Sequence, residues 1–353
     1  MNFFSRMSAE CLIMLCIAIP AVADPEVSSS HYDHTEELQT LIDFVHHEEF
    51  DSALKIAGKF TQIYPSSPVG YFYEAAIYDT ILGDYRDRRF EVPFNVAVNR
   101  AIDLSNKLLE QATANGEPAD PWTYFYLGGA LGFRGLYKFL NNDYFGAFYD
   151  GLAAVNHLKK CQEQDSQLYD IYYGLGCFYY WTSAKSRMLW FLPFVSDKRQ
   201  MGIEQLITAV RKGLYTGVEA QYALLRVYNN EKMYDNTLVF AQTLLEKFPR
   251  DIFCLNEMSY AYRQMQQWDN VIQTEQKIID RCMAIELHCF ERIAQSSLFK
   301  AEAFVKLKDP VSLKTEHAFV TAERNRRAEA GEQITIQADR YINQIEKLVK
   351  RNR

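Results

Sequence analysis

The sequence repeats itself with a period of 34 residues over positions 218–285. Large side chains set the pattern, because Leu224 and Tyr228 recur 34 positions later as Met258 and Tyr262. A period of this length holds two amphipathic helices and a tight turn, and each such unit buries its apolar face only against its neighbours. No clean run of residues alternates between apolar and polar as a half-buried strand requires. We therefore expect an all-α chain built from stacked helix pairs.

Further copies of the pattern lie nearer the N-terminus, and two of them are interrupted. In one copy Gly176 and Gly202 are 26 residues apart, whereas the repeat expects about 12. About 14 residues are therefore extra, centred on positions 183–199. Another copy, with helices expected near 124–131 and 147–154, carries about seven extra residues. A weaker copy starts near Pro68, and the earliest is marked by Phe44, Phe50, Ala53, Ala57, Phe60 and Pro65.

These residues resemble the tetratricopeptide repeat (TPR) family in its exported bacterial form. The resemblance covers positions 34–285 and implies an α-solenoid of about five to six helix pairs, with a helical insertion and a C-terminal capping helix. In such repeats the two helices of a pair cross at small residues, and large residues fill the space between pairs. The resulting division is a TPR-like domain at 34–310 with its insertion at 183–199, and a helical cap at 311–353. The apolar stripe of the cap is formed by Ala338, Tyr341, Ile345 and Leu348.

A shorter stretch, 174–202, is similar to the inclusion-body clearance proteins of fungi and their animal relatives, which are also built on TPR-like helices. The similarity rests on Gly174-Leu-Gly176-Cys-Phe178, Phe191-Leu-Pro-Phe194 and Asp197-Lys-Arg199. It supports the repeat fold and implies no particular function.

The N-terminus has the pattern of a secretory signal peptide at 1–23. Arg6 precedes an apolar run at 11–23, which ends in the small-residue cleavage pattern Ala21-Val22-Ala23. The run is 13 residues long, too short to span a bilayer comfortably, although an uncleaved anchor is the alternative. A short polar linker is expected at 24–33. The signal predicts export, to the periplasm or outer cell envelope or into the medium.

Composition and motifs exclude several functions. The net charge of −7 disfavours nucleic-acid binding, which needs a basic surface. There is no phosphate-binding loop, no GxSxG and no HExxH, so we expect no enzyme and no cofactor. His31, His34, His46 and His47 could contribute to a metal site, but polar residues near a mature N-terminus explain them more simply, and we expect no metal. The glycines between 128 and 135 are expected to permit close helix crossing rather than to bind a ligand.

Five cysteines remain after position 23, and an odd number leaves at least one free thiol in an exported protein. Cys282 and Cys289 are seven positions apart. If no turn intervenes, they lie two turns apart along one helix, too far for a direct disulfide. The simplest interpretation is that the cysteines are small buried apolar side chains.

Aromatic residues are abundant, with 23 Tyr, 23 Phe and 4 Trp. Most are expected in the core, because the repeat requires large side chains. The insertion is different, since it combines cations and aromatics outside the repeat. It could pack on the solenoid, grip a protein partner, or touch a membrane interface through 185–194.

The family resemblance implies protein or peptide recognition in a groove lined by the first helix of each pair. We therefore expect a non-catalytic exported protein that mediates protein–protein interaction or assembly in the cell envelope. The alternative is an envelope protein that binds carbohydrate or another small ligand through aromatic side chains. The candidate binding residues are Arg134, Tyr137, Lys185, Arg187, Trp190 and Arg226.

Overall fold

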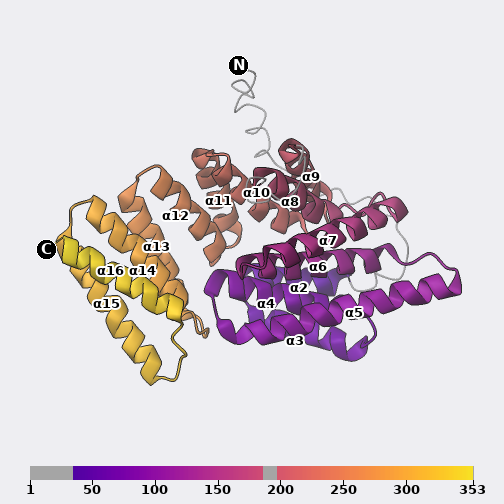
Figure 1. The fold of residues 1–353 in the computed structure, drawn as a ribbon, viewed down its shortest axis with the longest axis horizontal. Helices are drawn as coiled ribbons and strands as arrows, with labels where there is room; N and C mark the ends of the chain where they lie inside the picture. Colours follow the sequence, from indigo (N-terminus) through magenta and orange to yellow (C-terminus); the bar gives the residue numbers. More distant parts are fainter. Residues whose placement is uncertain (1–34, 186–196, 353) are drawn as a thin grey trace, which may run out of the picture. The chain divides into compact units, whose positions relative to one another are not determined.

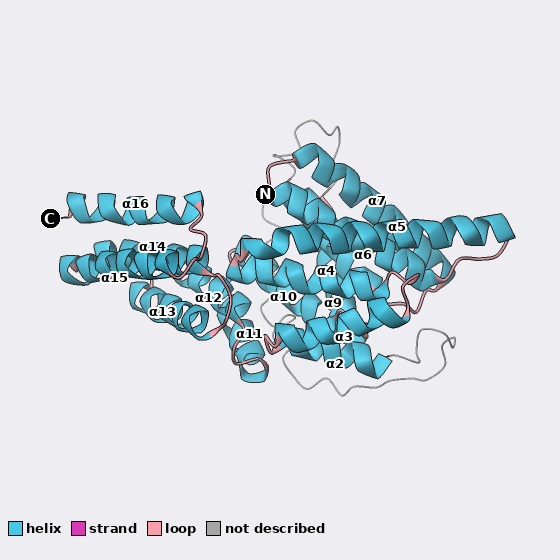
Figure 2. Ribbon diagram, turned by 90° about the horizontal axis from the view of Figure 1, so that it is seen from below, coloured by secondary structure: helices cyan, strands magenta, loops and turns pink. Residues whose placement is uncertain are grey.

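The computed structural model describes residues 35–185 and 197–352, and this part of the chain forms fifteen α-helices. Figure 1 shows their order along the chain, and Figure 2 shows no strand among them. The expected all-α class is confirmed. None of the described helices is long and apolar enough to span a membrane. The helices are α2 (Thr35–His46), α3 (Phe50–Ile63), α4 (Val69–Thr80), α5 (Glu91–Asn115), α6 (Pro121–Leu140), α7 (Tyr144–Gln164), α8 (Ile171–Ala184), α9 (Arg199–Lys212), α10 (Gly217–Asn230), α11 (Tyr234–Lys247), α12 (Ile252–Gln264), α13 (Trp268–Ala284), α14 (Phe290–Lys306), α15 (Pro310–Glu329) and α16 (Ile336–Arg351).

The helices pack as consecutive pairs in a TPR-like α-solenoid. Sequence neighbours contact each other along the chain, as in α4 with α5, α6 with α7 and α8 with α9. The first helices of successive pairs also contact one another, so that α4, α6, α8, α10 and α12 form a continuous row. This second set of contacts distinguishes a stacked solenoid from a string of independent hairpins. At the C-terminal end, α16 packs on α14 and α15, as expected for a capping helix.

Small residues lie where the two helices of a pair cross, as the repeat predicts. A Cβ atom on Gly128 would come within 2.8 Å of the Leu158 side chain of α7, the other helix of the pair. One on Gly129 would come within 2.6 Å of Phe72 on α4, the first helix of the preceding pair. Gly135 is similarly close to the backbone of α7. Gly132 is the exception, since nothing lies within 4 Å of its added Cβ position. Three of these four glycines therefore permit close approach, and none belongs to a ligand-binding loop.

Turns inside several of the described pairs use the same backbone conformation. Lys232, between α10 and α11, and Gln266, between α12 and α13, have φ angles of 61° and 58°. They are 34 positions apart, so the repeat in sequence is also a repeat in backbone geometry. Glu48, Asn142 and Lys308 occupy the same left-handed region at the corresponding turns. Such a residue ends a helix by turning the chain sharply, and here non-glycine residues do it.

The extra residues of the 124–154 copy lengthen its helices. α6 has 20 residues and α7 has 21, whereas the regular helices α10 and α11 have 14 each. Of the insertion at 183–199, residues 186–196 lie outside the described part of the chain, as do residues 1–34, where a signal peptide and a linker are expected.

One segment differs from the sequence expectation. The polar sequence of residues 84–89 suggests a loop rather than a tight repeat turn. In the structure this stretch lies in a π-helical turn (Ile81–Tyr85) and a 3-10 turn (Arg88–Phe90), and both contact α14 or the residues just before it. The Asp87 side chain is fully buried and accepts a hydrogen bond of 2.8 Å from the backbone N–H of His288. Arg292 of α14 donates to the backbone carbonyls of Gly83 and Asp84. These partners are about 200 positions away, so no local pattern could reveal them.

Candidate functional site

Charged side chains from distant parts of the chain converge on the row of first helices. We call them the Arg226 cluster: Arg226 and Glu219 on α10, Asp79 on α4, Asp84 in the π-helical turn, and Glu257 on α12. Nε of Arg226 donates to Oε1 of Glu257 at 3.3 Å. The other three carboxylates interact electrostatically with Arg226 and with one another. The packing of first helices against one another is what brings these positions together.

The carboxyl groups of the cluster resist ionisation. Loss of hydration raises the pKa of Asp79, Asp84 and Glu219 to about 7 in each case. Neighbouring carboxylates contribute to the raised pKa of Asp84 and Glu219, and Arg226 offsets part of the rise in all three groups. A neighbouring positive charge would favour the ionised form of these carboxyl groups, so the cluster suits a cationic ligand.

The cluster is surrounded by protein and still reaches solvent. Arg226 keeps 48% of its side-chain surface accessible, and Glu219 keeps 39%. The surrounding protein atoms nevertheless strip hydration from both groups. The groups of the cluster are therefore poorly hydrated and still accessible to a ligand.

Aromatic and sulfur groups adjoin these charges. The Arg226 guanidinium lies 4.6 Å from the ring centroid of Phe253, a cation–π contact. Tyr173 and Cys177 of α8 are half-buried beside the cluster, and each interacts electrostatically with Arg226 and Glu219. Burial raises the pKa of the Cys177 thiol to about 12, so this thiol stays protonated. It does not have the depressed pKa of a nucleophilic cysteine.

The cluster is not a metal site. Among the described residues, no group of three or more His, Cys, Asp or Glu side chains could hold one ion. His46 is buried, and burial lowers the pKa of its imidazole to about 3. Its Nε2 lies 3.7 Å from Oε1 of Glu219, but at neutral pH the contact joins a neutral ring to a carboxyl group. The negative groups are therefore spread over a surface rather than gathered around a point.

Of the residues singled out in the sequence, Arg226 is at the centre of this site. Arg134 is half-buried and bound through two hydrogen bonds of 2.8 Å to the carboxylate of Asp150. Tyr137 packs with its ring centroid 5.2 Å from that of Phe94. Arg134 and Tyr137 thus have intramolecular partners at some distance in sequence, and their role in binding stays a prediction.

The insertion residues are only partly covered by the structure. Lys185 is exposed, and its ammonium lies 5.5 Å from the ring centroid of Trp181. Arg187 and Trp190 lie outside the described residues. The proposed roles of the insertion in packing, partner capture or membrane contact remain predictions.

Sequence reasoning did not identify Asp79, Asp84 or Glu219. One signal was available, because Glu219 and Arg226 are seven positions apart and so share a face of an otherwise apolar helix. Asp79 offers a similar but weaker signal, near the end of the apolar helix α4. That these charges meet depends on which helices stack, which the sequence does not state.

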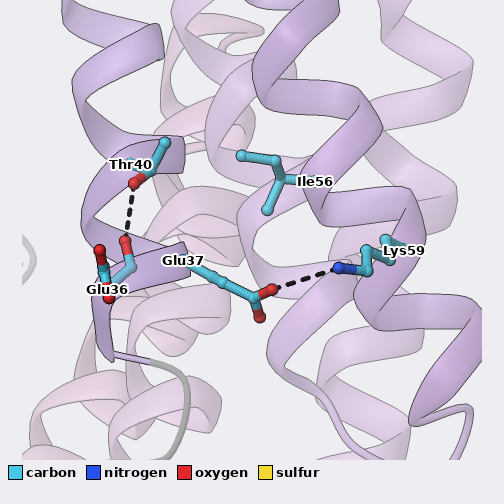
Figure 3. Close-up of a pocket in the computed structure, with 5 residues that line it drawn as sticks. All are labelled: Glu36, Glu37, Thr40, Ile56 and Lys59. Atoms are coloured by element: carbon cyan, nitrogen blue, oxygen red, sulfur yellow. Dashed lines mark hydrogen bonds and ion pairs between the residues drawn. The ribbon is translucent and has the colours of Figure 1, made fainter.

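A shallow depression lies elsewhere, between α2 and α3, and has a volume of about 200 Å³ (Figure 3). It is lined by Glu36, Glu37, Thr40, Ile56 and Lys59. Nζ of Lys59 pairs with Oε1 of Glu37 at 3.2 Å across it, between two exposed side chains. A shallow depression that is spanned by a surface ion pair is a poor binding site for a ligand.

Comparisons with known proteins add little to this description. No family model matches the chain, and no curated protein sequence matches it. The crystal structure of yeast Tom70 aligns with 91% of this chain and 90% of that chain, with a TM-score of 0.34 and 12% identical residues. The description of the fold therefore rests on the helix pairs, the row of first helices and the repeated turn geometry.

Proposed function

We propose that this chain is an exported, non-catalytic TPR-like protein that binds a basic segment of another protein at the Arg226 cluster. The observation that carries the proposal is the convergence of three solvent-reaching carboxyl groups, Asp79, Asp84 and Glu219, whose pKa values are raised to about 7. A ligand that brings positive charge would relieve their mutual repulsion and restore their ionised state.

An extended segment fits the cluster better than a compact ion. The carboxyl groups come from α4, the π-helical turn and α10, and they do not gather closely enough to share one metal. Lysine and arginine side chains spaced along a peptide can each meet a different carboxylate. Phe253 and Tyr173 border the charges, and they offer apolar area to the aliphatic parts of such side chains.

The test is binding of two labelled peptides of equal length, one rich in lysine and arginine and one with glutamate in those positions, to the full chain. Fluorescence anisotropy is the measurement. We expect the basic peptide to bind, and to bind more tightly as the pH rises from about 6 to about 8, because Asp79, Asp84 and Glu219 lose their protons over that range. Higher salt should weaken binding.

The variant for this test is Asp79→Asn combined with Glu219→Gln, which preserves shape and removes charge. We expect at least a tenfold loss of affinity, on the order of 1.4 kcal/mol. The matched control is Glu246→Gln, because Glu246 is exposed on α11, a second helix. Equal binding of the two peptides, or equal loss in both variants, would refute the proposed site.

The carbohydrate alternative has a different candidate surface. Tyr144, Phe145 and Tyr149 at the start of α7 are 40%, 62% and 69% exposed, and exposed rings suit sugar faces. Binding of a glycan that is lost in Tyr149→Ala and kept in the Asp79→Asn, Glu219→Gln variant would favour that function over peptide binding.

A further inference from the structure

Cys282 and Cys289 lie together at the corner between α13 and α14. The sequence leaves them two helical turns apart if no turn intervenes, but α13 ends at Ala284 and α14 begins at Phe290. The chain reverses between them, and Sγ of Cys289 lies 3.1 Å from the backbone carbonyl oxygen of Cys282. The two thiols also affect each other's ionisation, which raises the pKa of Cys282 and lowers that of Cys289. Both side chains are fully buried.

We propose that Cys282 and Cys289 are a disulfide-forming pair, oxidised while the chain folds. The geometry carries this inference, because Sγ of Cys289 lies against the backbone of Cys282 and both thiols are buried at the same corner. Rotation of the side chains can then bring the sulfurs to bonding distance without displacing either helix. All five cysteines of the described part are free thiols in the structure, and no contact with another cysteine is seen for Cys161, Cys177 or Cys254 among the described residues.

The electrostatics of the corner assign different roles to the two thiols. The hydrogen bond from Cys282, together with the guanidinium of Arg327, lowers the pKa of the Cys289 thiol, whereas burial raises that of Cys282. Cys289 is therefore the thiol that ionises first and attacks.

The oxidant is a small-molecule or protein disulfide. The Cys289 thiolate attacks one sulfur of that disulfide and releases the other as a thiolate, which takes up a proton. Cys282 then loses its proton and attacks Cys289 Sγ, which forms the internal disulfide and releases the second thiol of the oxidant. One disulfide is reduced for each one formed, and both protons end on the oxidant's thiols.

Because the corner is buried in the folded chain, the disulfide would form during folding and would then be protected from reduction. The corner is covered partly by α15, from which Arg327 reaches the Cys282 carbonyl oxygen at 3.4 Å. α15 follows the pair in the chain, so the thiols are open to an oxidant before it docks. The same corner also fastens distant elements, since the N–H of His288 binds Asp87 and the N–H of Phe290 binds Glu332. A disulfide between Cys282 and Cys289 would stabilise the corner at which these contacts meet.

The test uses the full chain, refolded with a mixture of reduced and oxidised glutathione, denatured, alkylated without reduction and digested with trypsin. Cys282 and Cys289 fall in one tryptic peptide, residues 282–292. We expect this peptide to carry no alkyl group and to be lighter than the reduced form by two hydrogen atoms. The peptide that contains Cys254, residues 251–263, is the internal control and should be alkylated.

Single variants identify the bond. In Cys282→Ser, Cys289 should become alkylated, and in Cys289→Ser, Cys282 should. Addition of a reductant should lower the thermal midpoint of the wild-type chain by several degrees and leave that of the Cys282→Ser, Cys289→Ser double variant unchanged. Peptide 282–292 with two alkyl groups, with bound glutathione, or linked to a different peptide would overturn the proposal.

Discussion

Gly176 and Gly202 face each other where α8 crosses α9, and each occupies the space that a side chain on the other would need. A Cβ on Gly176 would lie 2.8 Å from the carbonyl oxygen of Gly202, and a Cβ on Gly202 would lie 2.7 Å from the carbonyl oxygen of Gly176. The contact is between backbones, so no side-chain rotation can relieve it. The pairing follows from the repeat, which requires small residues at this crossing.

Replacement of either glycine should therefore push the two helices apart. We expect Gly176→Ala or Gly202→Ala to lower the free energy of unfolding by about 2–3 kcal/mol, in the range of other overpacked sites. The control is Gly132→Ala in α6, which has open space at its Cβ position and should gain up to about 1 kcal/mol from better helix propensity. Urea unfolding followed by circular dichroism measures both. An equal effect in all three variants would contradict the crossing argument.

The left-handed turn residues give a second prediction. Lys232 has a φ of 61° and an exposed side chain, a conformation that is costly for residues with a Cβ. Lys232→Gly should raise the free energy of unfolding by about 0.5–1 kcal/mol. Lys247→Gly is the control, because Lys247 is exposed within the last turn of α11 and glycine should weaken that helix. A loss of stability at both positions would show that the turn geometry is not limiting.

A buried ion pair between α14 and α15 gives a third. Nζ of Lys300 lies 2.5 Å from Oε2 of Glu316, and the two side chains are only 7% and 6% accessible. Lys300→Met would leave the Glu316 carboxylate buried without its cation, and we expect a loss of about 3–5 kcal/mol. The double variant Lys300→Met, Glu316→Leu should recover most of that loss, since neither charge then remains buried.

The surface pair Lys350–Glu346, with side chains 60% and 43% accessible, is the matched control for that ion pair. Lys350→Met should change stability by no more than about 0.5 kcal/mol. Thermal unfolding compares the variants. A similar midpoint for Lys300→Met and Lys350→Met would contradict the assigned importance of burial.

The pH dependence of stability follows from His46. Burial lowers its pKa to about 3 in the folded chain, whereas an unfolded histidine titrates near 6.5. The folded state therefore binds fewer protons, and its stability should fall as the pH drops from about 6.5 toward about 3. Between about pH 6.5 and pH 4.5 the loss from this residue is on the order of 2 kcal/mol.

The variant His46→Phe should remove that component of the acid sensitivity. Phenylalanine keeps the ring contacts with Tyr222 and Phe248, and Nε2 of His46 makes no hydrogen bond that would be lost. His47→Phe is the comparison, because 38% of that side chain is accessible and stays hydrated. The measurement is the urea midpoint of each variant as a function of pH. If the midpoint falls with decreasing pH as steeply in His46→Phe as in the wild-type chain, the assignment to His46 is refuted.

The carboxyl groups of the Arg226 cluster act in the opposite direction. Their pKa values are raised to about 7, so the stability that they contribute is present at low pH and lost as the pH rises from about 4 to about 7. The loss of stability at low pH that is due to His46 must therefore be measured as the difference in stability between the His46→Phe variant and the wild-type chain.

The sequence by itself determined the fold class and the repeat unit. Recurrence of large residues such as Leu224 and Met258 every 34 positions reports local helix periodicity and a local turn, and both depend on neighbours close in the chain. It also indicated the small residues at Gly176 and Gly202, because a crossing within one pair is a short-range property. Arg226 could be selected as a candidate because the repeat places it on the first helix of a pair, which lines the expected groove.

Only the tertiary structure determined which carboxyl groups lie near Arg226 and that Cys289 lies next to Cys282. Asp79 and Glu219 are 140 positions apart, and they interact because α4 and α10 belong to one row of stacked helices. Cys289 reaches Cys282 because a turn interrupts what the sequence could continue as one helix. The physical reason is the same in both cases. Helix periodicity depends on residues that are close in the sequence. The stacking of helices and the position of a chain reversal depend instead on how all the apolar faces are buried together.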